Sequence, residues 1–226
     1  MDITHLGHAS FKLKGKATTV VTDPYDPSIG LKFPKVEADI VTTSHDHRDH
    51  NATSQVGGDP FVVSGPGEYE IKGVRIVGVS SFHDEKKGAE RGKNTIYNIR
   101  IDNLSVCHLG DLGQSELGSE QLDAVGQVDI LLIPVGGVYT IDASVAAKIA
   151  ASLEPKIVIP MHYADTGNNL QLEPVEKFLK EMGAEKTEPL AKLSITGDKL
   201  PEELTVTLLE KAHWWQRLES ETKLKD

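Results

Sequence analysis

Three of the nine histidines in this chain of 226 residues fall within six residues, at His45, His47 and His50, and Asp49 lies beside the last of them. The cluster directly follows a short apolar segment, residues 38–43, which is typical of a buried strand. Imidazole nitrogens next to a carboxylate form a ligand set for Zn, Fe, Mn or Ni. The sequence therefore favours a fold that holds a metal-binding loop at the end of a strand.

The spacing of the cluster predicts two metal ions. Residues two apart on an extended loop point the same way, so His45 and His47 can hold one ion, while Asp49 and His50 diverge towards a second. Two ions need more ligands than these four. Further candidates follow other predicted strands, where a rigid scaffold presents functional groups: His83, His108, Asp111 and His162.

The first half of the chain predicts strands, and the second half predicts alternating helices and strands. The first 22 residues predict a hairpin that turns at residues 14–16, and strands are expected at 38–43, 61–63, 74–79, 95–101 and 104–107. Helices are expected near 115–125, 143–153 and 173–182, with strands at 129–134, 156–159 and 204–209. We expect one domain, residues 1–210, followed by a polar tail, residues 211–226.

Composition narrows the class of protein. Hydrophobic residues make up 38% and charged residues 26% of the chain, as in ordinary globular proteins, and no apolar run reaches bilayer length. The N-terminus has no signal-like pattern, so a cytoplasmic location is expected. The net charge of −10 disfavours nucleic acid as a partner. Cys107, the single cysteine, lies in an apolar stretch and is expected in the core.

Several motifs together resemble the metallo-β-lactamase superfamily. HDHRDH at 45–50, His83, HLGDLG at 108–113 and MHY at 161–163 are similar, in this order, to its metal motifs. THLGHASF at 4–11, TDPY at 22–25 and PVGG at 134–137 resemble its subgroup of small Zn-dependent hydrolases, which is related to ascorbate-6-phosphate lactonases. The resemblance implies the α+β class, with a four-layer αββα sandwich.

The resemblance also implies a set of metal ligands. It assigns three histidines to one ion, a second set to the other ion, and a carboxylate that bridges both and can take part in catalysis with Asp49. The first set is His45, His47 and His83, the second is Asp49, His50 and His162, and the bridge is Asp111. His108 competes with His83 for the first ion on sequence alone.

Four other residues are further candidates for roles at or near the site. Asp23 either orients a ligand histidine or opens a turn before Pro24. His8 is expected to approach the metal pocket, whereas His5 is more typical of a core or surface position. Tyr139 is a candidate substrate contact or proton donor, or part of a glycine-permitted turn that leads to a helix capped by Asp142.

These expectations favour a hydrolase with two divalent metal ions, most often Zn, with Mn, Fe or Ni as alternatives. Cations about 3.5 to 4 Å apart would share a hydroxide that attacks a small ester, lactone or phosphoester. The alternatives are a nucleic-acid phosphodiesterase and a non-catalytic metal-binding protein of the same fold. We expect a small-molecule substrate and no membrane partner. Trp214 and Trp215 in the tail suggest either homo-oligomer formation or packing back onto the domain.

Overall fold

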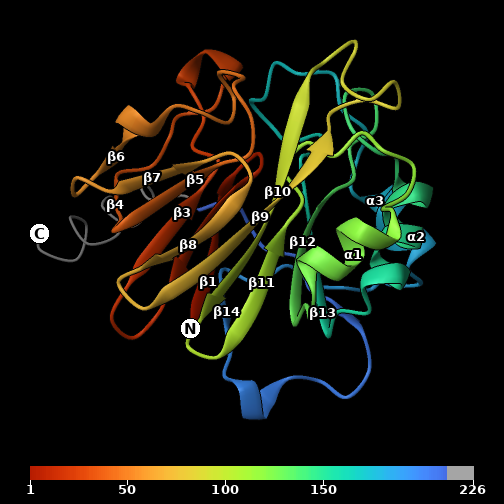
Figure 1. The fold of residues 1–226 in the computed structure, drawn as a ribbon. Helices are drawn as coiled ribbons and strands as arrows, with labels where there is room; N and C mark the ends of the chain where they lie inside the picture. Colours follow the sequence, from red (N-terminus) through yellow and green to blue (C-terminus); the bar gives the residue numbers. More distant parts are fainter. Residues whose placement is uncertain (213–226) are drawn as a thin grey trace, which may run out of the picture.

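Two β-sheets packed face to face form the centre of the computed structural model, which describes residues 1–212 (Figure 1). The six-stranded sheet has the order β14 (Leu193–Ser194), β1 (Asp2–Gly7), β2 (Ser10–Lys14), β3 (Thr19–Thr22), β5 (Ile40–Thr43) and β7 (Phe61–Ser64). The seven-stranded sheet has the order β15 (Thr205–Val206), β13 (Ile157–Met161), β12 (Ile130–Pro134), β11 (Leu104–His108), β10 (Lys93–Ile101), β9 (Val74–Phe82) and β8 (Gly67–Ile71). A two-stranded sheet pairs β4 (Val36–Glu37) with β6 (Val56–Gly57).

The space between the two large sheets holds one buried hydrophobic cluster. Phe11 and Val20 contribute from the six-stranded sheet, and Ile99 and Ile130 from the seven-stranded sheet. Successive side chains of a strand point to opposite faces, so each strand can give alternate residues to this core. Every residue of β12 and β13 is buried, as expected for parallel strands covered on both faces.

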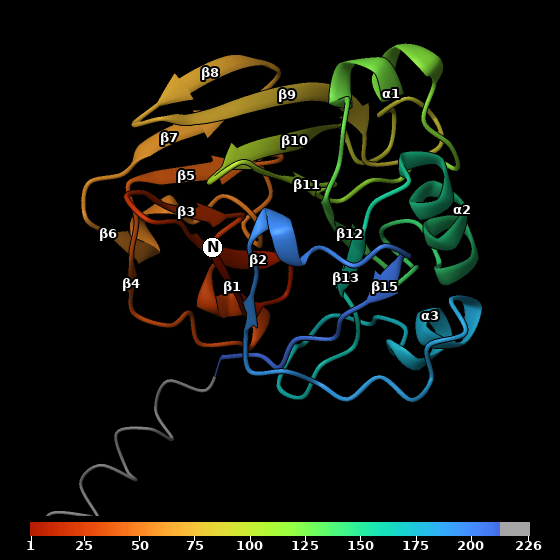
Figure 2. The same ribbon diagram turned by 90° about the horizontal axis from the view of Figure 1, so that it is seen from below.

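Within residues 1–212, three α-helices cover the outer face of the seven-stranded sheet: α1 (Ser119–Val125), α2 (Ala143–Leu153) and α3 (Glu176–Glu181) (Figure 2). Ala146 and Ile149 of α2 pack against this sheet. The Asp142 side chain accepts a hydrogen bond from the Val145 N–H at 2.8 Å, which confirms it as the cap of this helix.

The outer face of the six-stranded sheet carries a different layer. Tyr25, Ile29, Leu31 and Phe33 pack there, in a long segment whose regular structure is a short 3-10 helix, Pro27–Ile29. Within residues 1–212, no α-helix lies on this face. The predicted α+β class and sandwich are confirmed, with irregular chain as the fourth layer.

Several predicted boundaries were wrong. The helix expected near 115–125 begins at Ser119, because Gly118 has extended dihedral angles and serves as its N-cap. The helix expected at 173–182 spans only 176–181, and Pro174 near its start restricts the residue before it. The strand expected at 204–209 pairs with β13 only at 205–206. The first 22 residues form three strands, and the expected turn joins the second and third.

Four strands were missed, β4, β6, β8 and β14, and the prediction for the two tail tryptophans lies outside the described residues. Three of them have only two residues each, too few to show an alternating pattern, and β8 alternates Glu68 and Glu70 with Tyr69 and Ile71 at a sheet edge. Trp214 and Trp215 fall in residues 213–226, outside the part of the chain that the structure describes. Cys107 is buried, as predicted. Within residues 1–212, no helix has the length and apolar character needed to cross a bilayer.

The strand directions place the candidate residues at one edge of the sandwich. In the six-stranded sheet, β1 and β3 are both antiparallel to β2, so they run in the same direction. Strand β5 is parallel to β3 and shares that direction. In the seven-stranded sheet, β9, β11 and β13 run in one direction for the same reasons. Residues that follow these strands therefore converge on one end of the molecule.

Tyr97 joins the two sheets near this end. Its buried hydroxyl donates to the Thr43 carbonyl at 3.0 Å and accepts from the Gly65 N–H at 2.7 Å. Thr43 is the last residue of β5, one residue before the histidine loop begins. The hydroxyl of a buried tyrosine thus fixes the position of that loop against the opposite sheet.

Tyr97→Phe should lower the free energy of unfolding by about 1 to 3 kcal/mol, because the Thr43 carbonyl and the Gly65 N–H lose a partner. Urea unfolding followed by circular dichroism measures the change. Tyr69→Phe is the matched control, since the Tyr69 hydroxyl also contacts Gly65 but lies nearer the surface. Equal losses in the two variants would contradict the role assigned to Tyr97.

Candidate metal centre

The loop after β5 carries the histidine cluster and is held in place by Asp23. The Asp23 carboxylate accepts from the Ser44 N–H at 2.8 Å and lies 2.8 Å from His50 Nδ1. Asp23 and His50 are both fully buried. A histidine that donates through one nitrogen to a carboxylate presents its other nitrogen to a metal. These contacts favour the orienting role of Asp23 over that of a simple turn residue.

His45, His47 and His83 form the first group of side chains that could hold an ion, with ligand atoms within 4.8 Å of one another. The ring centroids of His45 lie 4.7 Å from His47 and 4.8 Å from His83. His47 is exposed, so this group can be reached from solvent. The structure brings together the three residues that the family resemblance assigned to one ion.

His8, Asp49, His50 and His162 form the second group. Three of them are the residues assigned to the second ion, and His8 is an addition. The His8 Nε2 atom lies 3.2 Å from Asp49 Oδ2, and its ring centroid lies 4.3 Å from that of His162. His8 also has a positive φ of 54°, a strained conformation often found at functional sites.

Asp111 lies between the two groups. Its Oδ2 atom is 3.2 Å from His50 Nε2 and 3.3 Å from the Nε2 atoms of both His83 and His162. The His45 Nε2 atom is 3.9 Å from the same oxygen. A single carboxylate oxygen thus contacts histidines from both groups and from both sheets.

The chemistry of this donor set fits metal ions. Among the described residues, His45 Nε2, His50 Nε2 and Asp111 Oδ1 are buried without a hydrogen-bond partner. Buried polar atoms in proteins are almost always hydrogen-bonded, and a bound cation satisfies such atoms as well. The nitrogen and oxygen ligands suit zinc and several other divalent metals.

His108 and His5 use their ring nitrogens elsewhere. His108 Nε2 contacts the Ala9 carbonyl at 2.8 Å, and its Nδ1 accepts from the Gly110 N–H at 3.1 Å. His5 Nε2 contacts the His8 carbonyl at 3.0 Å, and its ring stacks on Phe11. The structure therefore places His83, and not His108, in the first group.

Burial and mutual contacts set the protonation states. Burial, with the charge of His162 beside it, lowers the pKa of His8 to about 4, and burial with His50 nearby lowers the pKa of His45 to about 3. Burial alone would raise the pKa of Asp111, but His162 and His50 hold that pKa well below its usual range. His8 and His45 are therefore neutral near pH 7, as metal binding requires. Burial alone would lower the pKa of His50, but Asp111, Asp23 and Asp49 raise it well above its usual value, so a cation that binds this ring would replace its proton.

Asn94 is a residue that the sequence analysis missed. Its side-chain oxygen accepts from the Asp111 N–H at 3.0 Å, and its amide donates to the Leu109 carbonyl at 2.8 Å. Asn94 therefore fixes the segment that presents Asp111. It lies one residue before the predicted strand 95–101 and belongs to no motif, so nothing in the sequence singled it out.

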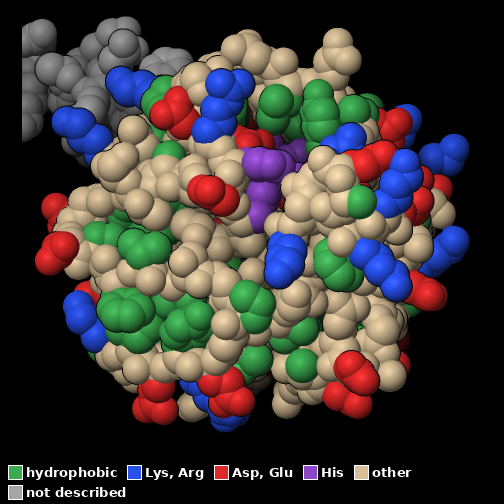
Figure 3. Space-filling model, turned by 45° about the horizontal axis from the view of Figure 1, so that its top comes forward, with side chains coloured by type: hydrophobic (Ala, Val, Ile, Leu, Met, Phe, Trp, Pro, Cys, Tyr) green, Lys and Arg blue, Asp and Glu red, His purple; other side chains and the backbone are tan. Residues whose placement is uncertain are grey.

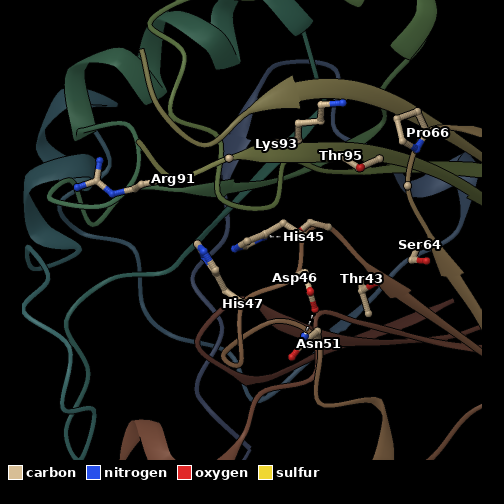
Figure 4. A pocket seen from close by; sticks show the side chains of 13 residues that line it. Thr43, His45, Asp46, His47, Asn51, Ser64, Pro66, Arg91, Lys93 and Thr95 are labelled. Carbon is tan, nitrogen blue, oxygen red and sulfur yellow. Dashed lines mark hydrogen bonds between the residues drawn. The ribbon is translucent and has the colours of Figure 1, made fainter. Parts of the chain in front are cut away.

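Two cavities open beside the first group. Figure 3 shows the histidine side chains in a hollow of the surface. A cavity of about 610 Å³ is lined by His45, His47, Arg91 and Lys93, among others (Figure 4). A second cavity, of about 510 Å³, is lined by His83 and Tyr139. Tyr139 thus lies where it can meet a substrate.

The chain is similar to known hydrolases over most of its length. Residues 2–162 match the family model of the beta-lactamase superfamily domain. A UPF0173 metal-dependent hydrolase from Thermococcus kodakarensis is 30% identical over 193 residues, which cover 72% of this chain and 84% of that protein. A second, from Thermococcus onnurineus, is 29% identical and covers 81% of this chain and 92% of that protein.

Solved structures agree with this family. A Thermotoga maritima protein, described as a predicted Zn-dependent hydrolase of the metallo-β-lactamase superfamily, superposes with a TM-score of 0.78 at 40% identity. The alignment covers 92% of this chain and 98% of that one. A Parabacteroides distasonis structure, with a TM-score of 0.62 at 23% identity over 92% of this chain and 93% of that one, shares the fold. The chain therefore belongs to the metallo-β-lactamase superfamily, and it is a metal-dependent hydrolase.

Proposed function

We propose that this hydrolase holds two divalent cations, most often zinc, and cleaves a small ester, lactone or phosphoester. The observation that carries the proposal is the position of Asp111, whose single oxygen contacts histidines of both candidate groups at 3.2 to 3.3 Å. A carboxylate that serves one ion would not need to face both groups. Manganese, iron and nickel are alternative metals for the same ligands.

We assign the residues to the two ions by the groups in which they lie. The first ion takes His45, His47 and His83, the second takes Asp49, His50 and His162, and Asp111 bridges them. His8 contacts Asp49 Oδ2, and we assign it the role of holding that carboxylate in place. Asp23 orients His50 through its Nδ1 atom.

Bound here, the cations would supply a Lewis acid for the scissile group and would lower the pKa of the attacking water. The chain supplies an ionised carboxylate beside the attacking water. Burial alone would raise the pKa of Asp49, but its contacts with His50 and His8 hold that pKa far below the usual range. Asp49 is therefore ionised near neutral pH, which suits a metal ligand, and it can orient the attacking water by accepting a hydrogen bond from it.

Asp111→Asn tests the bridging role. The amide keeps the shape of the side chain but removes its charge, so the metal content of the purified protein should fall from about two ions per chain, and turnover should fall at least about 100-fold. Metal is measured by plasma mass spectrometry, and turnover with p-nitrophenyl esters, lactones and phosphodiesters. Asp123→Asn, on the exposed face of α1, is the control. Full activity of a metal-free Asp111→Asn protein would contradict the proposal.

The metal-free protein should lose stability as the pH falls. The pKa of His8 is about 4 in the folded chain and about 6.5 when unfolded, so below pH 6.5 the unfolded state binds the extra proton. From pH 7 to pH 5, this one histidine should lower the free energy of unfolding by roughly 2 kcal/mol.

Urea unfolding of metal-free wild type and His8→Gln at pH 7 and pH 5 measures this contribution. The wild type should lose more stability between the two pH values than the variant does, because glutamine takes up no proton. Identical losses would show that the buried His8 ring does not resist protonation as its surroundings imply.

A further inference from the structure

Arg91 lies at the boundary of the two cavities beside the candidate metal centre. It is the one residue that lines both the cavity next to His45 and His47 and the cavity next to His83. Figure 4 shows Arg91 and the rings of His45 and His47 extending to the same side of the first cavity. In the same view, the Lys93 side chain extends away from both rings.

The backbone at Arg91 is held rigidly by Asp84. The Asp84 carboxylate accepts hydrogen bonds from the N–H groups of Lys86, Gly88, Glu90 and Arg91, at 2.7 to 3.0 Å. The loop 84–91 is therefore wrapped around one carboxylate. Because these four donors occupy both oxygens of Asp84, that carboxylate is already satisfied without the Arg91 side chain.

The guanidinium of Arg91 has few partners of its own. It donates to the Val138 carbonyl at 3.4 Å, and its central carbon lies 5.8 Å from the centre of the Tyr139 ring. Within residues 1–212 Arg91 takes part in none of the ion pairs, whereas the neighbouring Lys86 pairs with Glu90. An arginine stacked on an aromatic ring keeps most of its planar set of donors available for a carboxylate or a phosphate.

The charged residues that line the first cavity also favour the binding of an anion. The chain as a whole carries a net charge of −10. The first cavity, however, is lined by two cations, Arg91 and Lys93, against a single carboxylate, Asp46. The Asp46 side chain also accepts a hydrogen bond from Asn51, which partly satisfies it. An anion therefore meets an excess of positive charge in the first cavity, whereas in the second cavity Lys86 and Arg91 face the carboxylates Asp84, Glu85, Glu90 and Asp142.

We propose that Arg91 binds a carboxylate or phosphate group of the substrate and restricts the hydrolase to substrates that carry such an anion near the scissile bond. This inference rests on the hydrolytic function proposed above. It adds a binding residue outside the metal ligands. The anion lies between the guanidinium and the histidine rings, and the bond to be cleaved extends from it towards Asp111.

Binding and turnover test the proposal with the full-length, zinc-loaded protein. Isothermal titration calorimetry measures the affinity for succinate and, separately, for inorganic phosphate. Turnover is measured with mono-p-nitrophenyl succinate and with p-nitrophenyl butyrate, which share a leaving group and an acyl length but differ in the terminal carboxylate. The variants are Arg91→Gln, Lys93→Gln for the general charge of the cavity, and Arg75→Gln as a remote control that pairs with Glu68.

Arg91→Gln should weaken binding of succinate, phosphate or both by about 10-fold or more. It should lower kcat/KM for the succinate ester by a similar factor and change that for the butyrate ester less than about twofold, with an unchanged zinc content. The anion whose affinity falls identifies the group that Arg91 binds. Lys93→Gln should have a smaller effect, and Arg75→Gln none.

The proposal is overturned if the wild type binds neither anion, if Arg91→Gln binds both as tightly as the wild type, or if Lys93→Gln weakens binding equally. The outcomes separate this proposal from the hydrolytic function. Arg91-dependent binding without turnover of either ester would leave the anion site in place and remove the ester hydrolysis. Turnover of both esters without any dependence on Arg91 would support the ester hydrolysis and overturn the anion site.

Discussion

The contact between Asp111 and the histidines around it is the interaction on which the arrangement of the molecule depends. A buried carboxylate is costly unless charged or polar partners compensate it. Here three histidine nitrogens lie 3.2 to 3.3 Å away, on His50, His83 and His162, and the raised pKa of His50 places a positive charge beside the carboxylate in the metal-free chain. These residues follow three different strands in two sheets. The carboxylate can be stabilised only when both sheets are packed together in one register.

The packing around this contact is built to hold that register. Tyr97 joins β10 to the end of β5, and Asn94, on the same strand, fixes the segment of Asp111. Asp23 holds the loop between Ser44 and His50 from the opposite side. The strands that precede the candidate ligands run in one direction within each sheet, so their ends already lie close together. A few side-chain hydrogen bonds are then enough to fix the loops that carry the ligands.

The elements with strong local patterns were predictable from the sequence. The strand 38–43 with the histidine loop after it, the helix 143–153 with its Asp142 cap, and the core position of Cys107 all have local signals, and the structure shows each of them. The choice between His83 and His108 had no local signal. It depends on the carbonyl of Ala9, 99 residues before His108, which occupies one of its ring nitrogens.

The same limit explains what the sequence did not reveal about the site. The importance of Arg91 depends on a carboxylate seven residues earlier that binds four backbone N–H groups, and on a cavity shared by distant loops. His8 was expected near the pocket, but its contact with Asp49 arises only when β1 and β5 lie in the same sheet. Local patterns predicted the candidate ligands, while tertiary packing decides which of them meet.

The most direct test of this account is a crystal structure of the protein grown with zinc, with anomalous diffraction data collected at the zinc edge. The account predicts two anomalous peaks, one among His45, His47 and His83 and one among Asp49, His50 and His162, with Asp111 in contact with both. A single peak, or two peaks that Asp111 does not touch, would contradict it.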